Sequence, residues 1–304
     1  MHTNLITILG PTATGKTRLA SQLAHKYNGE IISADSRQVY IGMNIGTGKD
    51  LSDYLVNNDK ITYHLIDIIN PTEEFNLFMF KELFAKSFSV ISSRNKLPFL
   101  VGGTGLYISS IIQNYNLKKA DFNSAQVQEL ELLTLAELQN QLIKLNPNVH
   151  VKRDLLSKNR IIKTILVEEA KEGLKYFPKI NSLVLGVNLD RDEVRKRITE
   201  RLKKRLEQGM IEEVQQLLYS GLTYERLLSF GLEYKFISMY LKDDLNYDEM
   251  FQKLNTAIHQ FAKRQMTWFR RMEAKGYEIK WIDVNLEMGE KVELVKKWSK
   301  SILI

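Results

Sequence analysis

The chain has 304 residues, of which 44% are hydrophobic and 26% are charged, a composition typical of a folded protein with one large domain and a smaller one. The absence of cysteine excludes disulfides, zinc–thiolate sites and cysteine nucleophiles. A net charge of +7 indicates a polyanionic partner. The chain opens without the basic segment of a signal peptide, and no apolar run approaches the roughly 18 residues that span a bilayer, which predicts a cytoplasmic protein.

The most informative segment near the start reads Gly-Pro-Thr-Ala-Thr-Gly-Lys-Thr, which fits the phosphate-binding pattern G-x-x-x-x-G-K-[ST]. A buried strand is expected before it at 5–9 and a helix after it, so backbone N–H groups and a helix dipole would face an anion. A glycine-rich turn that matches by chance is the alternative, and the order strand, loop, helix disfavours it. The predicted phosphate-binding residues are Gly10, Pro11, Thr12, Ala13, Thr14, Gly15, Lys16 and Thr17, with Lys16 on the terminal phosphates and the Thr17 hydroxyl on Mg²⁺.

Short apolar strands alternate with helical segments over the first hundred residues. After 5–9 we expect strands at 30–34, 60–68 and 97–101. The segment 76–94 has helical periodicity, with inward positions at Phe80, Leu83, Phe84 and Phe88. Strands separated by helices predict a parallel sheet that binds its ligand at the carboxyl ends of the strands.

The pattern becomes helical and polar after residue 115, over 127–145 and 159–174. A further strand is expected at 184–187. Beyond it we expect helices at 191–218, 224–240 and 247–276, and a last strand at 278–284. The predicted fold is therefore α/β. It has a parallel-sheet core that carries the phosphate-binding loop (1–115 and 186–304, ending in a helical C-terminal region) and an inserted helical domain (116–185).

Asp35 directly follows the strand at 30–34, next to the phosphate-binding loop in such a sheet. A carboxylate there is suited to act as a base or to hold Mg²⁺, while a helix N-cap is the alternative. Ser36, Arg37 and Gln38 are suited to a purine edge, because amide and guanidinium groups pair with it through two hydrogen bonds.

A nucleotide kinase would need a second aspartate at a strand end. The candidate, Asp67, lies inside the extended segment 60–68, and the strand 97–101 runs into Gly-Gly-Thr-Gly without an acid. Phosphoryl transfer is therefore disfavoured.

Basic residues gather in two clusters of the C-terminal half. The first consists of Arg191, Arg195, Lys196, Arg197, Arg201, Lys203, Lys204 and Arg205. The second, interleaved with Trp268 and Phe269, consists of Lys263, Arg264, Arg270, Arg271 and Lys275. A solvated helix face would explain either cluster alone, whereas two clusters with aromatic neighbours favour an RNA backbone.

Taken together, the motifs resemble those of the tRNA dimethylallyltransferases, also called tRNA isopentenyltransferases. They occur in the family's order and span nearly the whole chain, at 10–17, 32–40, 43–49, 64–67, 101–107 and 262–270. The resemblance implies transfer of a dimethylallyl group from dimethylallyl diphosphate to N6 of the adenosine next to the anticodon (position 37), in tRNAs that read codons starting with U.

The resemblance also implies roles for individual residues. The loop 12–17 would hold the diphosphate with Thr17 on Mg²⁺, Asp35 would be the general base, and Arg201 would bind the diphosphate. The helical insertion would contact the anticodon stem-loop of the tRNA. The protein is expected to be a monomer. The residues predicted to contact tRNA are Asp35, Ser36, Arg37, Gln38, Thr104, Gln126, Asn159, Arg160, Lys163, Lys235, Lys263, Arg264, Gln265, Arg270 and Arg271.

The sequence departs from the family pattern at three places, all in parts expected to bind RNA. Lys163 follows Asn159-Arg160 where an Arg-Ala-Leu-Glu run is usual. Glu233 lies in an altered Gly-Tyr-Arg/Lys motif, and Ile258-His259 replaces Thr-Arg. These changes suggest a relative with its own tRNA preference.

Three other functions compete with tRNA prenylation. A prenyltransferase for free AMP, ADP or ATP would need neither the basic helices nor the 262–270 motif. A small-molecule or nucleotide kinase lacks its second aspartate. A non-catalytic RNA-binding protein would have no use for Asp35 beside an intact phosphate-binding loop.

Overall fold

The computed structural model describes residues 2–122, 124–147 and 157–299. They form two compact units, a core (Met1–Asn114 with Pro178–Ile304) and a helical insertion (Tyr115–Phe177). The insertion expected at 116–185 extends too far, because its last residues already belong to strand β7 of the core.

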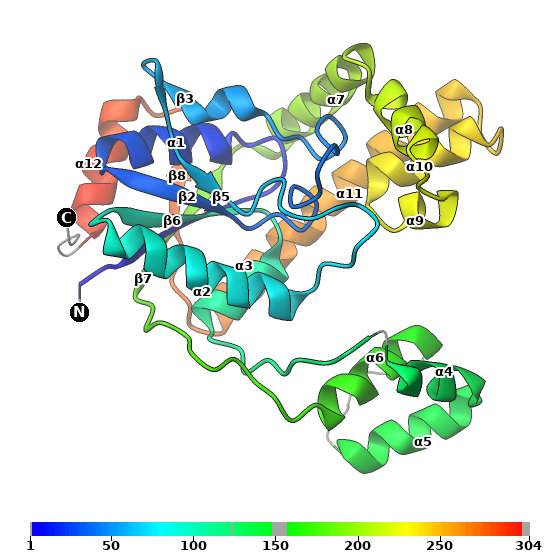
Figure 1. Ribbon diagram of the computed structural model, residues 1–304. Coiled ribbons are helices and arrows are strands. Elements are labelled where there is room, and N and C mark those ends of the chain that lie inside the picture. The colour runs from blue at the N-terminus through cyan, green and yellow to red at the C-terminus, as the bar shows by residue number, and fades with distance from the viewer. Residues whose placement is uncertain (1, 123, 148–156, 300–304) are drawn as a thin grey trace. The chain divides into compact units, whose positions relative to one another are not determined.

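The core is built on a six-stranded parallel sheet in the order β5-β2-β6-β1-β7-β8 (Figure 1). Its strands are β1 (Leu5–Leu9), β2 (Gly29–Ser33), β5 (Tyr63–His64), β6 (Leu97–Gly102), β7 (Ser182–Asn188) and β8 (Lys280–Asp283). Central strand β1 pairs Ile8 with Val101 of β6 and with Leu185 of β7. Every residue of β1 is buried, because helices cover both faces of the sheet, and this explains its continuous apolar run.

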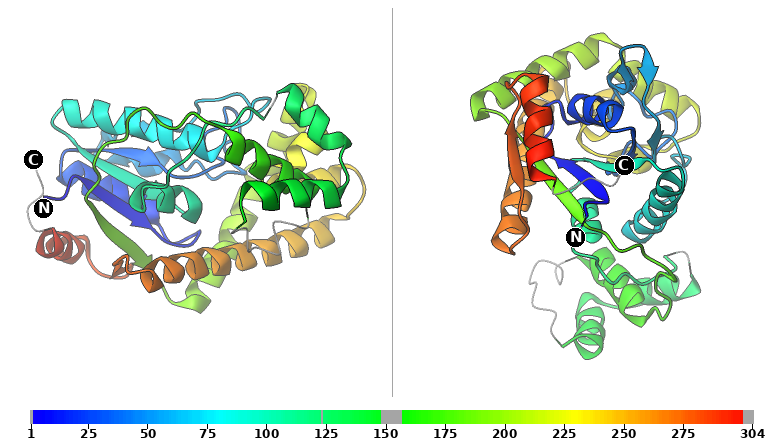
Figure 2. Two further views of the ribbon diagram at one scale, coloured as in Figure 1. Left: turned by 90° about the horizontal axis from the view of Figure 1, so that it is seen from below. Right: turned by 90° about the vertical axis from the view of Figure 1, so that its left-hand side faces the viewer.

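One face of the sheet is covered by α1 (Lys16–Lys26) and α12 (Met288–Trp298), which share an apolar cluster with Ile6 and Ile8. The other is covered by α2 (Leu77–Ser93) and α3 (Gly105–Ile112) (Figures 1 and 2). In α2, Phe80, Phe84 and Phe88 are buried as predicted, whereas Leu83 is half-buried. The sequence did not lead us to expect α3 and α12.

The single strand predicted at 60–68 is wrong. The chain instead forms a small antiparallel pair, β3 (Leu55–Val56) with β4 (Asp59–Lys60), after the short 3₁₀ helix η1 (Leu51–Tyr54), and then the two residues of β5. Leu65 (φ +63) and Asp67 (φ +53) are left-handed, which ends the extended chain. Asp67 forms an ion pair with buried Lys49.

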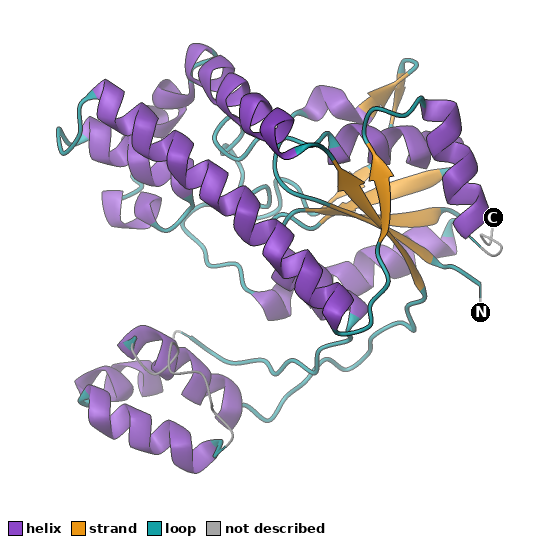
Figure 3. Ribbon diagram, turned by 180° about the vertical axis from the view of Figure 1, so that it is seen from behind, coloured by secondary structure: helices purple, strands orange, loops and turns teal. Residues whose placement is uncertain are grey.

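Five helices form the C-terminal part of the core: α7 (Arg191–Glu207), α8 (Met210–Tyr219), α9 (Tyr224–Leu228), α10 (Leu232–Leu241) and α11 (Tyr247–Ala274). Gly209 (φ +96) and Gly231 (φ +128) break the two longer helices predicted at 191–218 and 224–240. Helix α11 has 28 residues and extends from these helices to the sheet (Figure 3). Within the described ranges, none of the helices has the length and apolar character needed to cross a bilayer.

The insertion contains α4 (Ala125–Leu132), α5 (Leu135–Leu145) and α6 (Lys158–Glu169), which share an apolar cluster of their own. A capping box of Thr134 and Glu137 starts α5 and divides the helix predicted at 127–145. The entering and leaving segments meet: Lys118 and Gly173 form an antiparallel bridge, and Lys119 N donates to Glu172 O at 2.7 Å.

Candidate active site

The segment 10–17, called the 10–17 loop below, joins the end of β1 to the start of α1, in the order that the sequence predicts. Gly10 (φ +155) and Gly15 (φ +76) adopt backbone conformations that favour glycine. Thr14 Oγ1 and Lys16 Nζ both donate to Pro11 O, at 2.9 and 2.6 Å. The loop is therefore closed on itself, and the N-terminal N–H groups of α1 lie at its end.

The Lys16 ammonium group interacts electrostatically with both Arg201 and Asp35. Burial and, to a smaller extent, the positive charge of Arg201 lower its pKa to about 7, against the opposing effect of the negative charge of Asp35. The charged form of Lys16 is therefore disfavoured in the free protein. An anion bound against Lys16 and Arg201 would relieve their repulsion and restore the charge.

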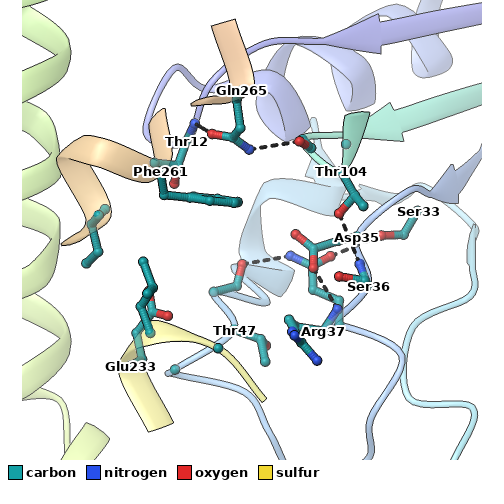
Figure 4. Close-up of a pocket in the computed structure, with 18 of the residues that line it drawn as sticks. Thr12, Ser33, Asp35, Ser36, Arg37, Thr47, Thr104, Glu233, Phe261 and Gln265 are labelled. Carbon is teal, nitrogen blue, oxygen red and sulfur yellow. Dashed lines mark hydrogen bonds between the residues drawn. The ribbon is translucent and has the colours of Figure 1, made fainter. Parts of the chain in front are cut away.

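Gln265 of α11 ties the 10–17 loop to the loop after β6. Its Oε1 accepts from Thr12 N at 2.9 Å, and its Nε2 donates to Gly103 O at 2.9 Å (Figure 4). The side chain is only 7% exposed. We expected Gln265 to contact tRNA, but the structure uses both ends of its amide inside the protein.

Asp35 follows β2 and lies among residues that are joined by hydrogen bonds. Its Oδ1 accepts from Arg37 N at 2.9 Å, and Ser36 N donates to Thr104 Oγ1 at 3.3 Å. The residues after Asp35 form a turn and no helix, so the helix N-cap alternative does not apply. Gln38 Nε2 donates to Gly48 O at 3.1 Å, which joins this turn to the segment 43–49.

Many of the predicted donor and acceptor residues line one cleft of about 470 Å³, whereas Gly10, Pro11, Ala13, Thr14 and Gly15 of the 10–17 loop are not among its lining residues. Figure 4 shows Thr12, Asp35, Ser36, Arg37 and Thr104 around it. The other predicted residues that line it are Lys16, Thr17, Gln38, Arg201, Arg264 and Gln265. The carboxyl ends of β1, β2 and β6 thus bring together a loop rich in N–H groups and a carboxylate.

Several residues that we did not predict also line the cleft. Phe261 and Trp268 of α11 add aromatic surface, and Trp268 Nε1 donates to Ser109 Oγ at 2.9 Å. Trp268 packs so closely on Gly105 that a Cβ there would lie 2.4 Å from the indole ring. Glu233 begins α10, and burial raises the pKa of its carboxyl against the opposing effect of Arg205.

The chain is similar over nearly its whole length to proteins of known family. Residues 38–272 match the IPP transferase family, and residues 3–68 match the isopentenyl transferase family. The chain is 48% identical to tRNA dimethylallyltransferase 1 of Geotalea uraniireducens, over 93% of both chains. It is 47% identical to tRNA dimethylallyltransferase 2 of Bacteroides fragilis, over 97% of both. This chain belongs to the tRNA dimethylallyltransferase family.

A solved structure supports the same assignment. The tRNA isopentenylpyrophosphate transferase of Bacillus halodurans aligns with a TM-score of 0.69 and 30% identity, over 97% of this chain and 95% of that one. The predicted family, α/β fold class and enzyme class, a prenyltransferase, are therefore confirmed.

The remaining residues predicted to contact tRNA are not among those that line the cleft. In the insertion, Gln126 donates to the carboxylate of Glu169, and Lys163 lies over the Phe122 ring with its Nζ 5.7 Å from the centroid. The others in the insertion are Asn159 and Arg160 at the start of α6. In the core, exposed side chains on α10 and α11 are those of Lys235, Lys263, Arg270 and Arg271.

Glu213 of α8 is a positioning residue that the sequence analysis missed. Its carboxylate accepts from the backbone N–H groups of Asn44, Ile45 and Gly46, at 2.8, 2.7 and 3.0 Å. Tyr234 Oη donates to the same carboxylate at 2.8 Å. Glu213 thereby fixes the segment that carries Thr47 and Gly48 into the cleft. An Ile-Glu-Glu-Val run on an amphipathic helix gives no sign of this role.

Proposed function

We propose that this enzyme transfers the dimethylallyl group of dimethylallyl diphosphate to N6 of the adenosine at position 37, next to the anticodon, in tRNAs that read codons starting with U. Family membership supports the reaction class. The observation that carries the proposal is that Asp35 and the 10–17 loop line one cleft, where Lys16 responds to the charges of both Asp35 and Arg201. The chemistry needs a base for the acceptor and an anion site for the leaving group in one cleft.

The acceptor half of the reaction falls to Asp35. The adenine N6 amine is a poor nucleophile because its lone pair is delocalised into the ring. As the new N6–C bond forms, the Asp35 carboxylate takes the N6 proton, a contribution typically worth about 10²–10⁴-fold. Oδ1 of Asp35 is held by Arg37 N, which orients the carboxylate toward the cleft (Figure 4).

The 10–17 loop with its Lys16, together with Arg201, binds the donor and stabilises its leaving group. The C–O bond of the donor breaks, and the diphosphate leaves with its electron pair. Backbone N–H groups at the start of α1 and the two cations stabilise the negative charge that develops on it. A bound anion favours the charged form of Lys16, which then stabilises the charge that develops on the leaving group.

Mg²⁺ is the cofactor that we propose for this site. Thr17 lines a second hollow beside Asp50 and Asp53. The described residues offer no group of three acidic or histidine side chains that would enclose a metal ion. This arrangement fits an ion held by the Thr17 hydroxyl and phosphate oxygens, because Mg²⁺ keeps several waters and uses few protein ligands. The bound ion would supply charge neutralisation of the diphosphate.

We propose that the anticodon stem-loop is held by the exposed cations of α7, α10 and α11 and by the insertion, with the enzyme acting as a cytoplasmic monomer. The target base leaves its stack to enter the cleft, at a cost of a few kcal/mol. Among the residues that depart from the family pattern, Glu233 and Ile258 line the cleft, His259 Nε2 contacts Asn255 Oδ1 at 3.2 Å, and Lys163 lies over the Phe122 ring in the insertion. Glu233 is the charged residue of the two that line the cleft, and it is therefore the departure most suited to alter the choice of tRNA.

Mass analysis of nucleosides tests the proposal. The enzyme is incubated with dimethylallyl diphosphate, Mg²⁺ and unmodified tRNA that reads a U-starting codon, in parallel with the same tRNA carrying guanosine at position 37. We expect N6-dimethylallyl-adenosine only from the first tRNA. Product from free AMP or ATP but not from tRNA would contradict the proposal and favour a nucleotide prenyltransferase.

A further inference from the structure

Two arginines of α7 share one carboxylate. Arg201 and Arg205 lie four residues apart and therefore on the same face of the helix. Nη2 of Arg201 lies 2.5 Å from Oδ2 of Asp50, whereas Nη2 of Arg205 lies 3.9 Å from the same oxygen. Arg201 also reaches Thr12 of the 10–17 loop, with Nη1 donating to Oγ1 at 3.5 Å. Asp50 thus holds Arg201 and leaves Arg205 just beyond hydrogen-bond distance.

Arg205 is buried more deeply than Arg201. Its side chain is 11% exposed, compared with 32% for Arg201 and 49% for Asp50. Within the described ranges its Nη2 is fully buried and has no hydrogen-bond acceptor. A buried guanidinium nitrogen without an acceptor costs free energy, and such groups are rare unless they serve a function.

Gly48 makes room for this guanidinium. A Cβ at Gly48 would lie 1.7 Å from Nη2 of Arg205 and 2.7 Å from Nη2 of Arg201. Gly48 also has a φ of +68, a conformation that side chains rarely adopt. The segment 43–49 is therefore shaped to admit Arg205, although the guanidinium lacks a full partner there.

We propose that Arg205 is a positioning residue for Arg201: it receives the Asp50 carboxylate when diphosphate draws Arg201 away. This inference rests on the proposed role of Arg201 as a diphosphate-binding residue. Before the donor binds, Asp50 pairs with Arg201. Once the diphosphate oxygens take over Arg201, the released carboxylate moves toward Arg205 and supplies its missing acceptor. Asp50 thus exchanges one arginine partner for the other and is not left without an ion pair.

This exchange of ion-pair partners increases the affinity for diphosphate. Without Arg205, Asp50 would lose its partner whenever Arg201 turned to the diphosphate, and a carboxylate without a partner opposes that turn. The carboxylate of Glu233 also influences Arg205 electrostatically. The ion pair of Arg205 that the structure gives among the described residues is the one with Asp50.

A double-mutant cycle on the full-length protein tests the exchange. Calorimetry measures the Kd of inorganic diphosphate, at fixed Mg²⁺, for the wild type, R205M, D50N and the double variant. We expect R205M to weaken binding by about fivefold and D50N to tighten it by about threefold. In the D50N background, R205M should change the Kd less than twofold, because no carboxylate remains to be exchanged.

Two controls accompany the cycle. K203M removes a neighbouring exposed charge of α7 and accounts for long-range electrostatics. Thermal unfolding checks that each variant is folded. If R205M does not fold, R205Q takes its place in the same cycle, because it keeps a hydrogen-bond donor.

The outcomes separate the inference from the proposed function. An equal loss from R205M in both backgrounds would overturn the exchange and make Arg205 a direct diphosphate ligand. Suppression of the R205M effect by E233Q instead of D50N would overturn the assignment of Asp50. If R201M leaves the Kd unchanged, the proposed role of Arg201 itself fails, whatever the cycle shows.

Discussion

The donor side of the cleft and the proposed RNA-contacting side are built in opposite ways. On the donor side, side chains of two helices hold loop residues: Gln265 of α11 binds Thr12, and Arg201 of α7 binds Asp50. On the RNA side, Lys263, Arg270 and Arg271 are exposed side chains of one helix. A leaving group needs a preorganised environment, whereas a phosphate backbone needs only charge at approximate positions. Substitutions should therefore have large effects on the donor side and small, additive effects on the RNA side.

Asp35 should give the largest effect, because Arg37 N holds its carboxylate in place and because it is proposed to take the proton. We expect D35N to lower kcat by about 10²–10⁴-fold and to change the Kd for tRNA by less than about fourfold. Single-turnover assays and tRNA binding measure the two quantities. The control D59N removes a carboxylate whose side chain is 73% exposed outside the cleft. Near-normal turnover of D35N would rule out Asp35 as the base.

Gln265 is the sharpest test of the comparison, because it lies on the helix proposed to contact RNA but is hydrogen-bonded to the donor side. We expect Q265A to raise the KM for dimethylallyl diphosphate by about tenfold and to lower the free energy of unfolding by about 1–3 kcal/mol, since Thr12 N and Gly103 O lose their partner. The control Q260A removes an exposed glutamine of the same helix. A larger change in the KM for tRNA than for the donor would place Gln265 on the RNA side.

Lys16 makes diphosphate affinity depend on pH. In the free protein its pKa is lowered to about 7, and a bound anion raises it, so binding takes up a proton above pH 7. Affinity should therefore fall by up to about tenfold per pH unit above 7. Calorimetry in buffers of different ionisation enthalpy should show a net uptake of protons on binding above pH 7 that is attributable to Lys16.

The Lys16 contribution is isolated by comparison with K16M, because diphosphate itself also titrates in this range. K26M, an exposed lysine of the same helix, serves as the control. Identical proton uptake by K16M and the wild type would show that Lys16 does not titrate on binding.

Lys263 should give the smallest effect. K263A is expected to weaken tRNA binding a few-fold and to reduce the slope of log K against log salt concentration by about one unit, as expected for one phosphate contact. K253A, an exposed lysine of α11 outside the proposed contact set, should leave the slope unchanged. An unchanged slope for K263A would make Lys263 part of a solvated face.

The same contrast explains what could be predicted from the sequence. The 10–17 loop and the residues after Asp35 are contiguous motifs, so their order along the chain and their place at strand ends were correctly predicted. Gln265 lies 253 residues from the Thr12 amide that it binds, and no local pattern reveals such a contact. The role of Glu213 and the proposed role of Arg205 depend in the same way on contacts with the distant segment 43–50.

The fold was predicted where a single physical preference dominated. Buried parallel strands such as 5–9 and 97–101 were predicted because both faces are covered and the apolar run is continuous. The segment 60–68 is equally apolar in places, but left-handed residues at Leu65 and Asp67 turn it away from the sheet. The breaks at Gly209 and Gly231 were missed because isolated glycines also occur within helices.

The bridge between Lys118 and Gly173 gives the insertion a modular character. The segments that enter and leave the insertion meet before its helices begin. The contacts between them therefore already offset the entropy cost of closing this long loop. A short turn in place of residues 119–172 would join the same two backbone positions. Such a shortened chain should retain the fold of the core and its affinity for diphosphate, so that a catalytic module could be grafted onto other RNA-binding domains.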